Sequence, residues 1–473
     1  MADLTRLPAS AAAAAIASGQ VRSTELVEAC LGRIAALDGT LKAFITVCSD
    51  EPLAEAQRAD RERAAGRLRG PLHGIPVAIK DITLTAGIRT TFGSRVYENH
   101  VPDADDACVA KLRNAGAIVI GKTNTPEFAF GALCTNAIQG PTANPYDSRF
   151  SSGGSSGGSA VAVAAGMVPL AQGTDFGGSV RTPASFCGVV GLRPTPGRIP
   201  SAPKRFAWNA LNTHGILARD VGDAALMLEA MSGAELGDPL SVGIGPWRAA
   251  SLDAPGPARP RVAYSPDLGF AKVHSDVTAV FDRAIDAMRR LDLALVPGTP
   301  DPAGAQHAFE TLRAGQLYAS YAELAERHRD LLSPSFLWNV ERGRGISALD
   351  YLTAEAERSR LYERFARFFR DHDVLATVSA AVPPFPNTQE NVAEIEGVEM
   401  ANIIDYLRIT YLISLVGFPS VSIPCGFTAA GLPIGLQLVA RPFEETALLA
   451  FARRLERELG FRYRPPASKE HQP

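Results

Sequence analysis

The sequence lacks the features that mark a metalloprotein or a disulfide-rich secreted protein. Its six cysteines are spread over 473 residues without any C-x-x-C pair, and its eight histidines do not cluster with them. Such spacing argues against a disulfide framework and against a zinc site. We therefore predict no metal and no cofactor, and we expect most of the cysteines to be small buried apolar residues.

A strong charge and long apolar runs are missing as well. The net charge of −3 gives no electrostatic footprint for nucleic acid or for an anionic membrane. No apolar run approaches the roughly 18–20 residues needed to span a bilayer. Asp3 and Arg6 precede a short alanine run, unlike a basic leader followed by a long apolar segment. We therefore expect an unprocessed cytoplasmic protein that needs neither nucleic acid nor a membrane.

What is present is an alternation of helical and extended patterns. The composition, 46% hydrophobic and 21% charged, is that of an ordinary globular protein. Apolar periodicity predicts helices within 1–66, with Ser23 as an N-cap, and at 105–114, 159–165, about 305–372 and 444–459. Short apolar runs predict strands at 75–79, 117–120, 167–171, 374–378, 421–424 and 434–439. This alternation predicts an α/β fold, and the lack of repeats or long linkers favours one large domain.

The densest feature is the stretch 151–191, where glycine-serine clusters at 153–159 and 177–179 flank an alanine- and valine-rich run. Glycine loses much conformational entropy on folding and offers no side chain to pack. Two such clusters indicate a backbone that turns tightly, or approaches another group closely, at two points.

One motif nearby suggests nucleotide binding but lacks the required context. Residues 116–123 read GAIVIGKT and match the Walker A pattern. A phosphate-binding loop needs free backbone amides after its strand, whereas here the four variable positions form the strand itself. The amides of that strand belong to a sheet, so we do not predict nucleotide binding.

A second motif suggests an esterase. Residues 154–158 read GSSGG and match the nucleophile elbow of α/β-hydrolases, which requires an apolar strand directly before it. The preceding residues 144–149 form a loop by composition. A Ser-His-Asp triad would also need a downstream histidine, and no histidine is singled out by its context. This chemistry is retained as an alternative.

Lys80 ends the predicted buried strand at 75–79, where sheet-based sites commonly lie. A lysine can act as a base only when it is neutral, which requires burial to lower its pKa. This segment alone fits a solvated or salt-bridged lysine as well as a catalytic one.

Several blocks in a fixed order resemble the amidase signature family of serine hydrolases with a Ser-cisSer-Lys triad. The resemblance is dense from about residue 70 to 200 and recurs near the C-terminus in GFPSVSIPCGF and GLPIGLQLVARP. The matching blocks are PVAIKD, GKTNTPEF, GGSSGGSA, GTDFGGSVR and GVVGLRPTPGR. The resemblance implies one domain over 1–473, with a mixed, twisted β-sheet covered by helices on both faces. Its expected parts are a core at about 70–200, a helical insertion at about 300–372, and strands and a helix at 373–465 that complete the sheet.

The resemblance also implies roles for individual residues. Ser179 is the expected nucleophile that forms an acyl-enzyme, and Ser155, following a cis peptide bond, is the expected bridging serine. Lys80 is the expected base, which takes a proton from Ser155 while Ser155 takes one from Ser179.

The remaining expected site residues surround this triad. The expected oxyanion hole consists of the backbone amides of Phe176, Gly177, Gly178 and Ser179, because glycines let amides face the substrate. Asp175 and Arg181 are expected to hold the nucleophile loop by hydrogen bonds, although a surface ion pair is an alternative for Arg181. Ser156 is expected either to support Lys80 or to cap the following helix.

The substrate pocket is expected after the TN-P motif, at Phe128, Ala129, Phe130 and Gly131. Its apolar, aromatic character favours an aryl or alkyl amide over a small charged one. Because a serine acyl-enzyme also forms from esters and carbamates, anilides and urethanes are further candidate substrates. The predicted partners are such a small molecule and water.

Two positions depart from another branch of the family, the glutamine-hydrolysing subunit of tRNA-dependent amidotransferases. Thr182 follows Ser179, Val180 and Arg181, where that branch is similar to S-I-R-Q. Residues 194–198 read PTPGR instead of a P-T-Y-G-R-like run. We therefore favour a free-standing hydrolase, as a monomer or homodimer, and the alternative is the amidotransferase subunit.

Overall fold

The fold is built on one mixed sheet. The computed structural model describes residues 3–253, 259–461 and 463. Its sheet has eleven strands in the order β1-β3-β2-β4-β6-β5-β12-β13-β9-β7-β8. These strands are β1 (Phe44–Val47), β2 (Pro76–Lys80), β3 (Ile118–Thr123), β4 (Leu170–Asp175), β5 (Val190–Arg193), β6 (Thr213–Ala218), β7 (Arg261–Tyr264), β8 (Ala294–Pro297), β9 (Val374–Val378), β12 (Ser420–Phe427) and β13 (Pro433–Val439). A separate hairpin pairs β10 (Glu394–Ile395) with β11 (Val398–Glu399).

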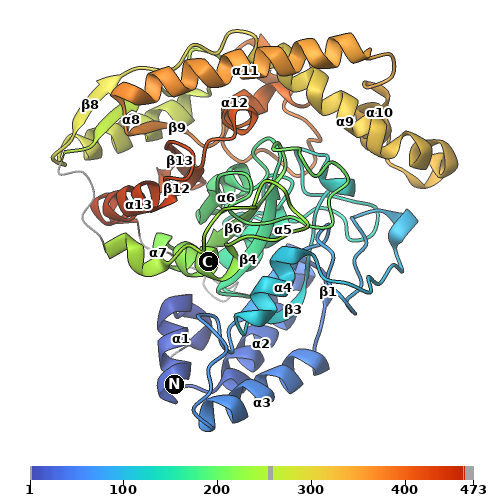
Figure 1. The fold of residues 1–473 in the computed structure, drawn as a ribbon, viewed down its shortest axis with the longest axis vertical. Coiled ribbons are helices and arrows are strands. Elements are labelled where there is room, and N and C mark those ends of the chain that lie inside the picture. Colours follow the sequence, from blue (N-terminus) through green and yellow to red (C-terminus); the bar gives the residue numbers. More distant parts are fainter. Residues whose placement is uncertain (1–2, 254–258, 462, 464–473) are drawn as a thin grey trace.

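Helices surround this sheet along its whole length (Figure 1). They are α1 (Ala9–Ser18), α2 (Ser23–Leu41), α3 (Asp50–Ala64), α4 (Ala107–Asn114), α5 (Gly157–Ala164), α6 (Arg181–Cys187), α7 (Val221–Met231), α8 (Ser275–Met288), α9 (Ala305–Arg327), α10 (Pro334–Glu341), α11 (Ala348–Asp371), α12 (Arg408–Val416) and α13 (Glu445–Leu459). In Figure 1, α1 to α3 lie at one end of the molecule, and α9 to α11 form a layer across the other end. Among the described residues, no helix is both long and apolar enough to cross a membrane.

Helices cover both faces of the sheet, as the alternation of side chains along β6 shows. A Cβ on Gly215 would lie 2.9 Å from Val180 Cγ2, which immediately precedes α6. The neighbouring residue His214 points the other way, toward Asp106 at the start of α4. Helix α5 packs on α6, and α7 packs on α4, so the two faces carry different helix layers.

The strand order brings the glycine-serine stretch beside Lys80. Strands β2 and β4 are parallel, with Val77 opposite Leu170 and Ala78 opposite Ala171. Lys80 at the end of β2 therefore lies next to the last residues of β4. The carboxyl ends of parallel strands are the usual place for a ligand site in an α/β sheet.

Several predicted elements need correction. The strand predicted at 167–171 is β4, which begins at Leu170 and continues through Gln172 and Thr174 to Asp175. The strand predicted from the apolar pattern ended too early, because the polar side chains that follow are buried and hydrogen-bonded inside the sheet. The region 1–66 is not all helical, since β1 pairs antiparallel with β3.

The predicted cap at Ser23 is also wrong. Ser23 is the first residue of α2, and its hydroxyl donates to the Gly74 carbonyl at 2.8 Å. The Asp60 carboxylate of α3 accepts from the Ser23 amide at 2.7 Å. The start of α2 is thus capped from a neighbouring helix, which local sequence does not reveal. The expected C-terminal part, 373–465, contains β9 to β13 and α13, and its residues 462, 464 and 465 lie outside the described residues.

A glycine substitution tests how tightly α5 packs on the sheet. A Cβ on Gly158 would lie 2.4 Å from the Asn124 amide nitrogen and 2.5 Å from the Ala43 carbonyl oxygen. We expect Gly158→Ala to lower the free energy of unfolding by about 1–3 kcal/mol in urea denaturation, because backbone atoms must shift. Gly32→Ala, in α2 with nothing within 4 Å, should instead raise it by up to about 1 kcal/mol. Equal stability of the two variants would contradict this packing.

Candidate active site

Lys80 is a buried amine without a carboxylate partner. Its side chain is 0% exposed, and Nζ lies 2.6 Å from Ser155 Oγ and 3.0 Å from Thr174 Oγ1. Within the described chain, no carboxylate oxygen lies within 4 Å of this nitrogen. The two hydroxyls are therefore its immediate polar neighbours.

Burial lowers the pKa of Lys80 to about 7, far below the 10.5 of a free lysine. Desolvation disfavours the ammonium form, and the charge of Asp175 offsets this effect only in part. Near neutral pH a substantial fraction of the amine is neutral and can accept a proton. This is the condition for a lysine base, and the surrounding residues meet it.

The two glycine-serine clusters meet in space. The peptide bond between Gly154 and Ser155 is cis, as the family resemblance implied. The Ser156 amide donates to the Ser179 carbonyl at 3.0 Å, which joins the two clusters. The Ser156 hydroxyl neither contacts Lys80 nor caps α5; it donates to the Thr174 carbonyl at 3.2 Å. Ser156 therefore links the start of α5 to β4.

Ser179 lies on the wall of a small cavity. It is half-buried, between the end of β4 and the start of α6. The cavity has a volume of about 50 Å³. Its lining comes from the oxyanion segment, the chain before α5, helix α9 and the segment 403–407: Ala129, Phe130, Gly131, Ala132, Gly154, Phe176, Gly177, Ser179, Phe309, Arg313, Ile403, Ile404 and Leu407.

The predicted oxyanion segment has one amide already engaged. The Gly178 amide donates to Asp175 Oδ1 at 2.8 Å, so it does not face the cavity as a free donor. Among the described residues, no protein group accepts from the amides of Phe176, Gly177 or Ser179. These three amides remain available, and the prediction for Gly178 needs correction. Gly178 has φ +127°, and a Cβ there would lie 2.2 Å from Thr410 Oγ1, so only glycine fits.

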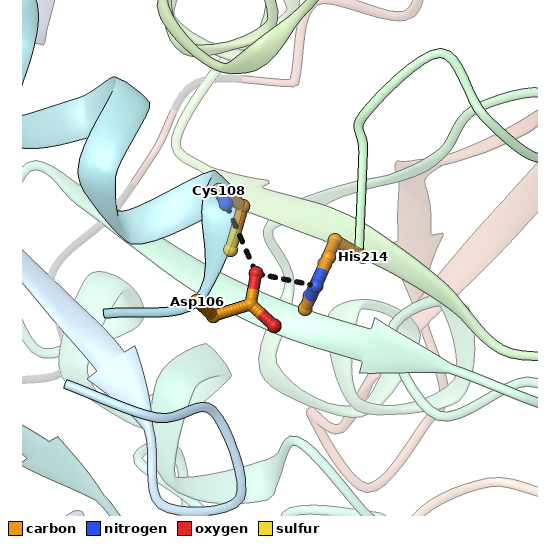
Figure 2. Close-up of side chains that lie close together, drawn as sticks. All are labelled: Asp106, Cys108 and His214. Atoms are coloured by element: carbon orange, nitrogen blue, oxygen red, sulfur yellow. Dashed lines mark hydrogen bonds and ion pairs between the residues drawn. The ribbon is translucent and has the colours of Figure 1, made fainter. Parts of the chain in front are cut away.

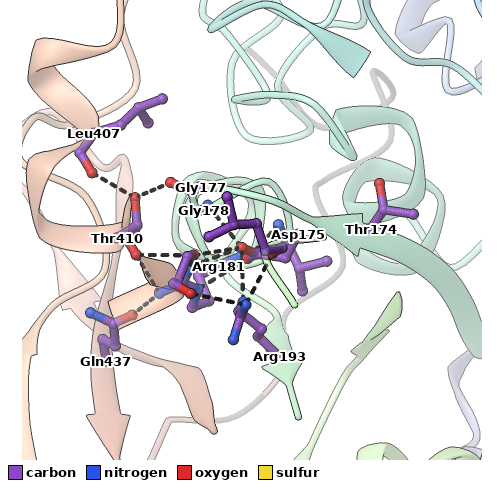
Figure 3. Close-up of polar contacts among 12 residues, drawn as sticks. Thr174, Asp175, Gly177, Gly178, Arg181, Arg193, Leu407, Thr410 and Gln437 are labelled. Carbon is purple, nitrogen blue, oxygen red and sulfur yellow. Dashed lines mark hydrogen bonds and ion pairs between the residues drawn. The ribbon is translucent and has the colours of Figure 1, made fainter. Parts of the chain in front are cut away.

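Asp175 is the centre of a buried ionic network behind this segment (Figure 3). Its carboxylate is 2.8 Å from Arg181 Nη2 and 3.5 Å from Arg193 Nε. Burial alone would raise the pKa of Asp175, but the two guanidinium groups hold it well below its usual range. Arg181 is thus part of a fully buried pair, and the alternative of a surface pair is wrong.

The same network ties the nucleophile loop to the C-terminal part of the chain. Arg181 Nη1 donates to the Thr410 carbonyl at 3.0 Å and to Gln437 Oε1 at 2.6 Å. The Thr410 hydroxyl donates to the Gly177 carbonyl at 2.7 Å (Figure 3). Helix α12 and strand β13 therefore fix the backbone on which Ser179 lies. Sequence reasoning missed Thr410 and Gln437, since no local motif connects them to Ser179.

Three of the four predicted pocket residues line the cavity, and Phe128 does not. Phe128 is 5% exposed, and its ring centroid lies 4.6 Å from that of Phe336 and 5.1 Å from that of Tyr321. Its φ of +49° turns the side chain into this aromatic cluster. Phe128 therefore supports the loop from behind while Phe130 faces the cavity.

Among the described residues, one group of side chains lies close enough together to hold a metal ion: Asp106, Cys108 and His214 (Figure 2). His214 Nε2 lies 3.2 Å from Asp106 Oδ1, and Nδ1 lies 2.9 Å from Gln172 Nε2. Burial raises the pKa of the Cys108 thiol well above its usual value, which favours the neutral thiol over a metal-binding thiolate. The cluster fits an internal polar contact between β6 and the start of α4 better than a metal site.

This polar contact extends to the strand of Lys80. Gln172 Oε1 accepts from the Lys80 amide at 3.1 Å, while Gln172 Nε2 faces His214. Through Gln172 of β4, His214 of β6 thus supports the backbone of β2. In the described chain, no histidine is hydrogen-bonded to Ser155 or Ser179. A Ser-His-Asp triad therefore finds no support in this geometry.

The Walker-like lysine is buried as well. Lys122 Nζ donates to the Thr83 carbonyl at 2.5 Å and to the Thr90 hydroxyl at 2.7 Å. Residues Ile118–Thr123 form β3 in the interior of the sheet. Lys122 therefore joins β3 to the loop at Thr83 and Thr90 by hydrogen bonds inside the protein. This agrees with the rejection of nucleotide binding at this motif.

Comparisons with known proteins agree with the geometry. The family model described as Amidase matches residues 25–449. A glutamyl-tRNA(Gln) amidotransferase subunit from Anaeromyxobacter dehalogenans is 38% identical, over 98% of this chain and 98% of its own. An acylamidase of Rhodococcus erythropolis is 34% identical, over 96% of each chain. The crystal structure of a bacterial aryl acylamidase of the amidase signature family has a TM-score of 0.90 at 26% identity, covering 96% of each chain. The predicted fold class and family resemblance are confirmed.

The pH dependence of turnover tests the state of Lys80. If neutral Lys80 is the base, kcat/KM should fall about tenfold per pH unit below the pKa of about 7 and level off above it. Lys80→Met should lower kcat by about 10²- to 10⁴-fold and abolish this acidic limb. Thr174→Val, which removes the other hydroxyl at Nζ, should keep the limb. An acidic limb that persists in Lys80→Met would assign the ionisation to another group.

Unfolding measurements test the Asp175 network. Asp175→Asn leaves two buried arginines without their carboxylate, so the free energy of unfolding should drop by about 3–5 kcal/mol. Turnover should also fall, because Asp175 holds the Gly178 amide. The exposed pair of Asp147 and Arg149 provides the control, and Asp147→Asn should leave the denaturation midpoint near that of the wild type. Similar midpoints for both variants would show that the network is not a stabilising element.

Proposed function

The chain belongs to the amidase family, whose members act on carbon–nitrogen bonds, and we propose that it hydrolyses linear amides through an acyl-enzyme on Ser179. The observation that carries this proposal is the 2.6 Å contact between the buried Lys80 amine and Ser155, beside the cavity that Ser179 lines. The proposal needs no metal and no cofactor, because each step uses side chains and amides of this chain.

The first half-reaction would proceed through a relay of protons. Neutral Lys80 accepts the proton of Ser155, and Ser155 accepts the proton of Ser179 as the Ser179 oxygen attacks the carbonyl carbon. The contact between the Ser156 amide and the Ser179 carbonyl supports this order, since it brings the two serine segments together. The relay run backward protonates the leaving amine.

The negative charge that develops on the carbonyl oxygen needs donors near Ser179. The amides of Phe176, Gly177 and Ser179 are free of protein acceptors among the described residues, so we assign them this role. Removal of such a donor typically costs about 3–4 kcal/mol in the barrier. In the second half-reaction, water loses a proton to the same relay and attacks the acyl-enzyme, which releases the acid.

The proposed substrate is a small amide, and the relay itself would also accept esters and carbamates. The apolar lining by Phe130, Phe176 and Phe309 supports alkyl or aryl groups near the carbonyl. The triad alone does not separate amides, anilides and urethanes, because each of them offers the nucleophile a carbonyl carbon that carries a leaving group. We propose a free-standing enzyme, as a monomer or homodimer.

A second candidate function is the glutamine-hydrolysing subunit of an amidotransferase. The 38% identity to the amidotransferase subunit from Anaeromyxobacter dehalogenans, over nearly the whole chain, favours it. Thr182 and Pro196, which depart from the pattern of that branch, favour the free-standing enzyme. The esterase with a Ser-His-Asp triad has no comparable observation in its favour.

A substrate screen across amides, anilides, esters and carbamates, with mass detection of products, tests the proposal. We expect at least one anilide or amide to be cleaved, with turnover lost in Ser179→Ala because the nucleophile is gone. A fluorophosphonate probe should label Ser179 in the wild type. His214→Asn should retain turnover, because the side chain touches neither serine.

The rival functions predict different results in the same screen. Turnover of glutamine alone, stimulated by the other components of an amidotransferase, would replace the first proposal with the second. Loss of all turnover in a folded histidine variant would point to a histidine-based triad. An unlabelled Ser179 would argue against a serine enzyme.

A further inference from the structure

The cavity of Ser179 contains a buried positive charge. Arg313, from α9, lines this cavity and is 6% exposed. Of the described residues that line the cavity, only Arg313 has a charged side chain. Burial lowers the pKa of Arg313 to about 10, so the guanidinium still carries its charge near neutral pH.

Arg313 lacks the internal partner that other buried arginines have. Arg181 and Arg193 share the carboxylate of Asp175, and Arg198 pairs with Glu445 at 3.1 Å. Arg219 donates from both terminal nitrogens to backbone carbonyls. No carboxylate of the described chain lies within 4 Å of the Arg313 guanidinium. Its Nη2 donates to a neutral acceptor instead, Asn339 Oδ1, at 2.6 Å.

The nearest anion is already bound by other groups. Glu310, one turn before Arg313, lies 3.6 Å from Arg342 Nη2 and accepts from Asn402 Nδ2 at 3.3 Å. Gln306 Nε2 donates to the same carboxylate at 3.1 Å. Arg313 and Arg342 thus share one acid, and Arg342 is the closer of the two. A net positive charge remains at the cavity wall.

The orientation of the guanidinium is fixed and leaves donors free. Its carbon lies 5.5 Å from the centroid of the Phe130 ring, and Phe130 lines the cavity. Asn339 holds Nη2, while Nε and Nη1 donate to no group of the described chain. A buried charge without a partner is costly, whereas an arginine fork in an apolar cavity binds a carboxylate strongly.

We propose that Arg313 binds a carboxylate on the acyl part of the substrate, which makes the preferred substrates amides of short dicarboxylic acids. The cavity volume of about 50 Å³ and the apolar walls at Phe309 and Leu407 favour a short chain between the two carbonyl carbons. This inference rests on the proposed amide hydrolysis and specifies its substrate class. Sequence reasoning favoured an uncharged acyl group, because nothing near the signature blocks pointed to α9.

The test compares 4-nitroanilides of succinic and glutaric acid with neutral isosteres in which a carboxamide replaces the free carboxylate. Release of nitroaniline reports cleavage of the anilide bond alone. The wild type should prefer the acid by about 10- to 100-fold in kcat/KM, the usual worth of charge-assisted hydrogen bonds. Arg313→Met should abolish or reverse this preference, and Arg313→Lys should retain part of it. Arg344→Met, which removes an exposed charge outside the cavity that is paired with Glu341, should keep the wild-type preference.

Equal kcat/KM for acid and carboxamide in the wild type, or an unchanged preference in Arg313→Met, would overturn the role of Arg313. A binding measurement separates this failure from failure of the proposed function. Calorimetric titration of Ser179→Ala with glutaranilic acid should show binding at least about tenfold tighter than that of its carboxamide isostere. If no anilide is cleaved, the proposed function fails, and this titration still decides whether Arg313 binds the carboxylate. Equal binding of the two compounds would contradict it.

Discussion

The site depends on keeping one amine in the protein interior without an anion beside it. Lys80 is fully buried, touches the hydroxyls of Ser155 and Thr174, and has its pKa lowered to about 7 by burial. An adjacent carboxylate would stabilise the ammonium form and remove the base. The sheet must therefore supply uncharged polar neighbours on all sides, which explains why Gln172 and Thr174 lie in the buried part of β4.

The anion that the site does contain is neutralised elsewhere. Asp175 lies one residue after Thr174, yet its charge is taken up by Arg181 and Arg193. This arrangement uses the carboxylate to hold the Gly178 amide and to connect the nucleophile loop with α12 and β13. The pKa values of two buried groups in the same site are thus both lowered, with opposite effects on charge. Lys80 is shifted toward its neutral form and Asp175 toward its charged form. Arg313 is a further buried charge near the nucleophile, and we infer that its counterion comes with the substrate.

Much of the site could be anticipated from the sequence, because its parts lie in short blocks whose order is distinctive. Lys80 ends a recognisable apolar strand, and the glycine-serine clusters around Ser155 and Ser179 stand out by composition. Strands β1, β5, β6, β7 and β8 were not predicted, because runs of four to six residues carry too little periodicity. Contacts between distant segments were missed for a more general reason. The bond from Arg181 to Gln437 and the position of Arg313 beside Phe130 follow from tertiary packing, and no local pattern encodes them. The assignment of Phe128 to the pocket failed because neighbouring residues of a loop can face opposite sides.

The ionisation of Lys80 in the resting protein is the most direct measure of the central claim. Lysine labelled with ¹³C at Cε would be followed by NMR from pH 5 to 10, and the Lys80 signal would be assigned by its absence in Lys80→Met. The account predicts that this signal titrates with a midpoint near 7, well below the 10.5 of a free lysine. A Lys80 signal that retains the shift of an ammonium group up to pH 10 would contradict the account, because the amine could not then accept a proton from Ser155.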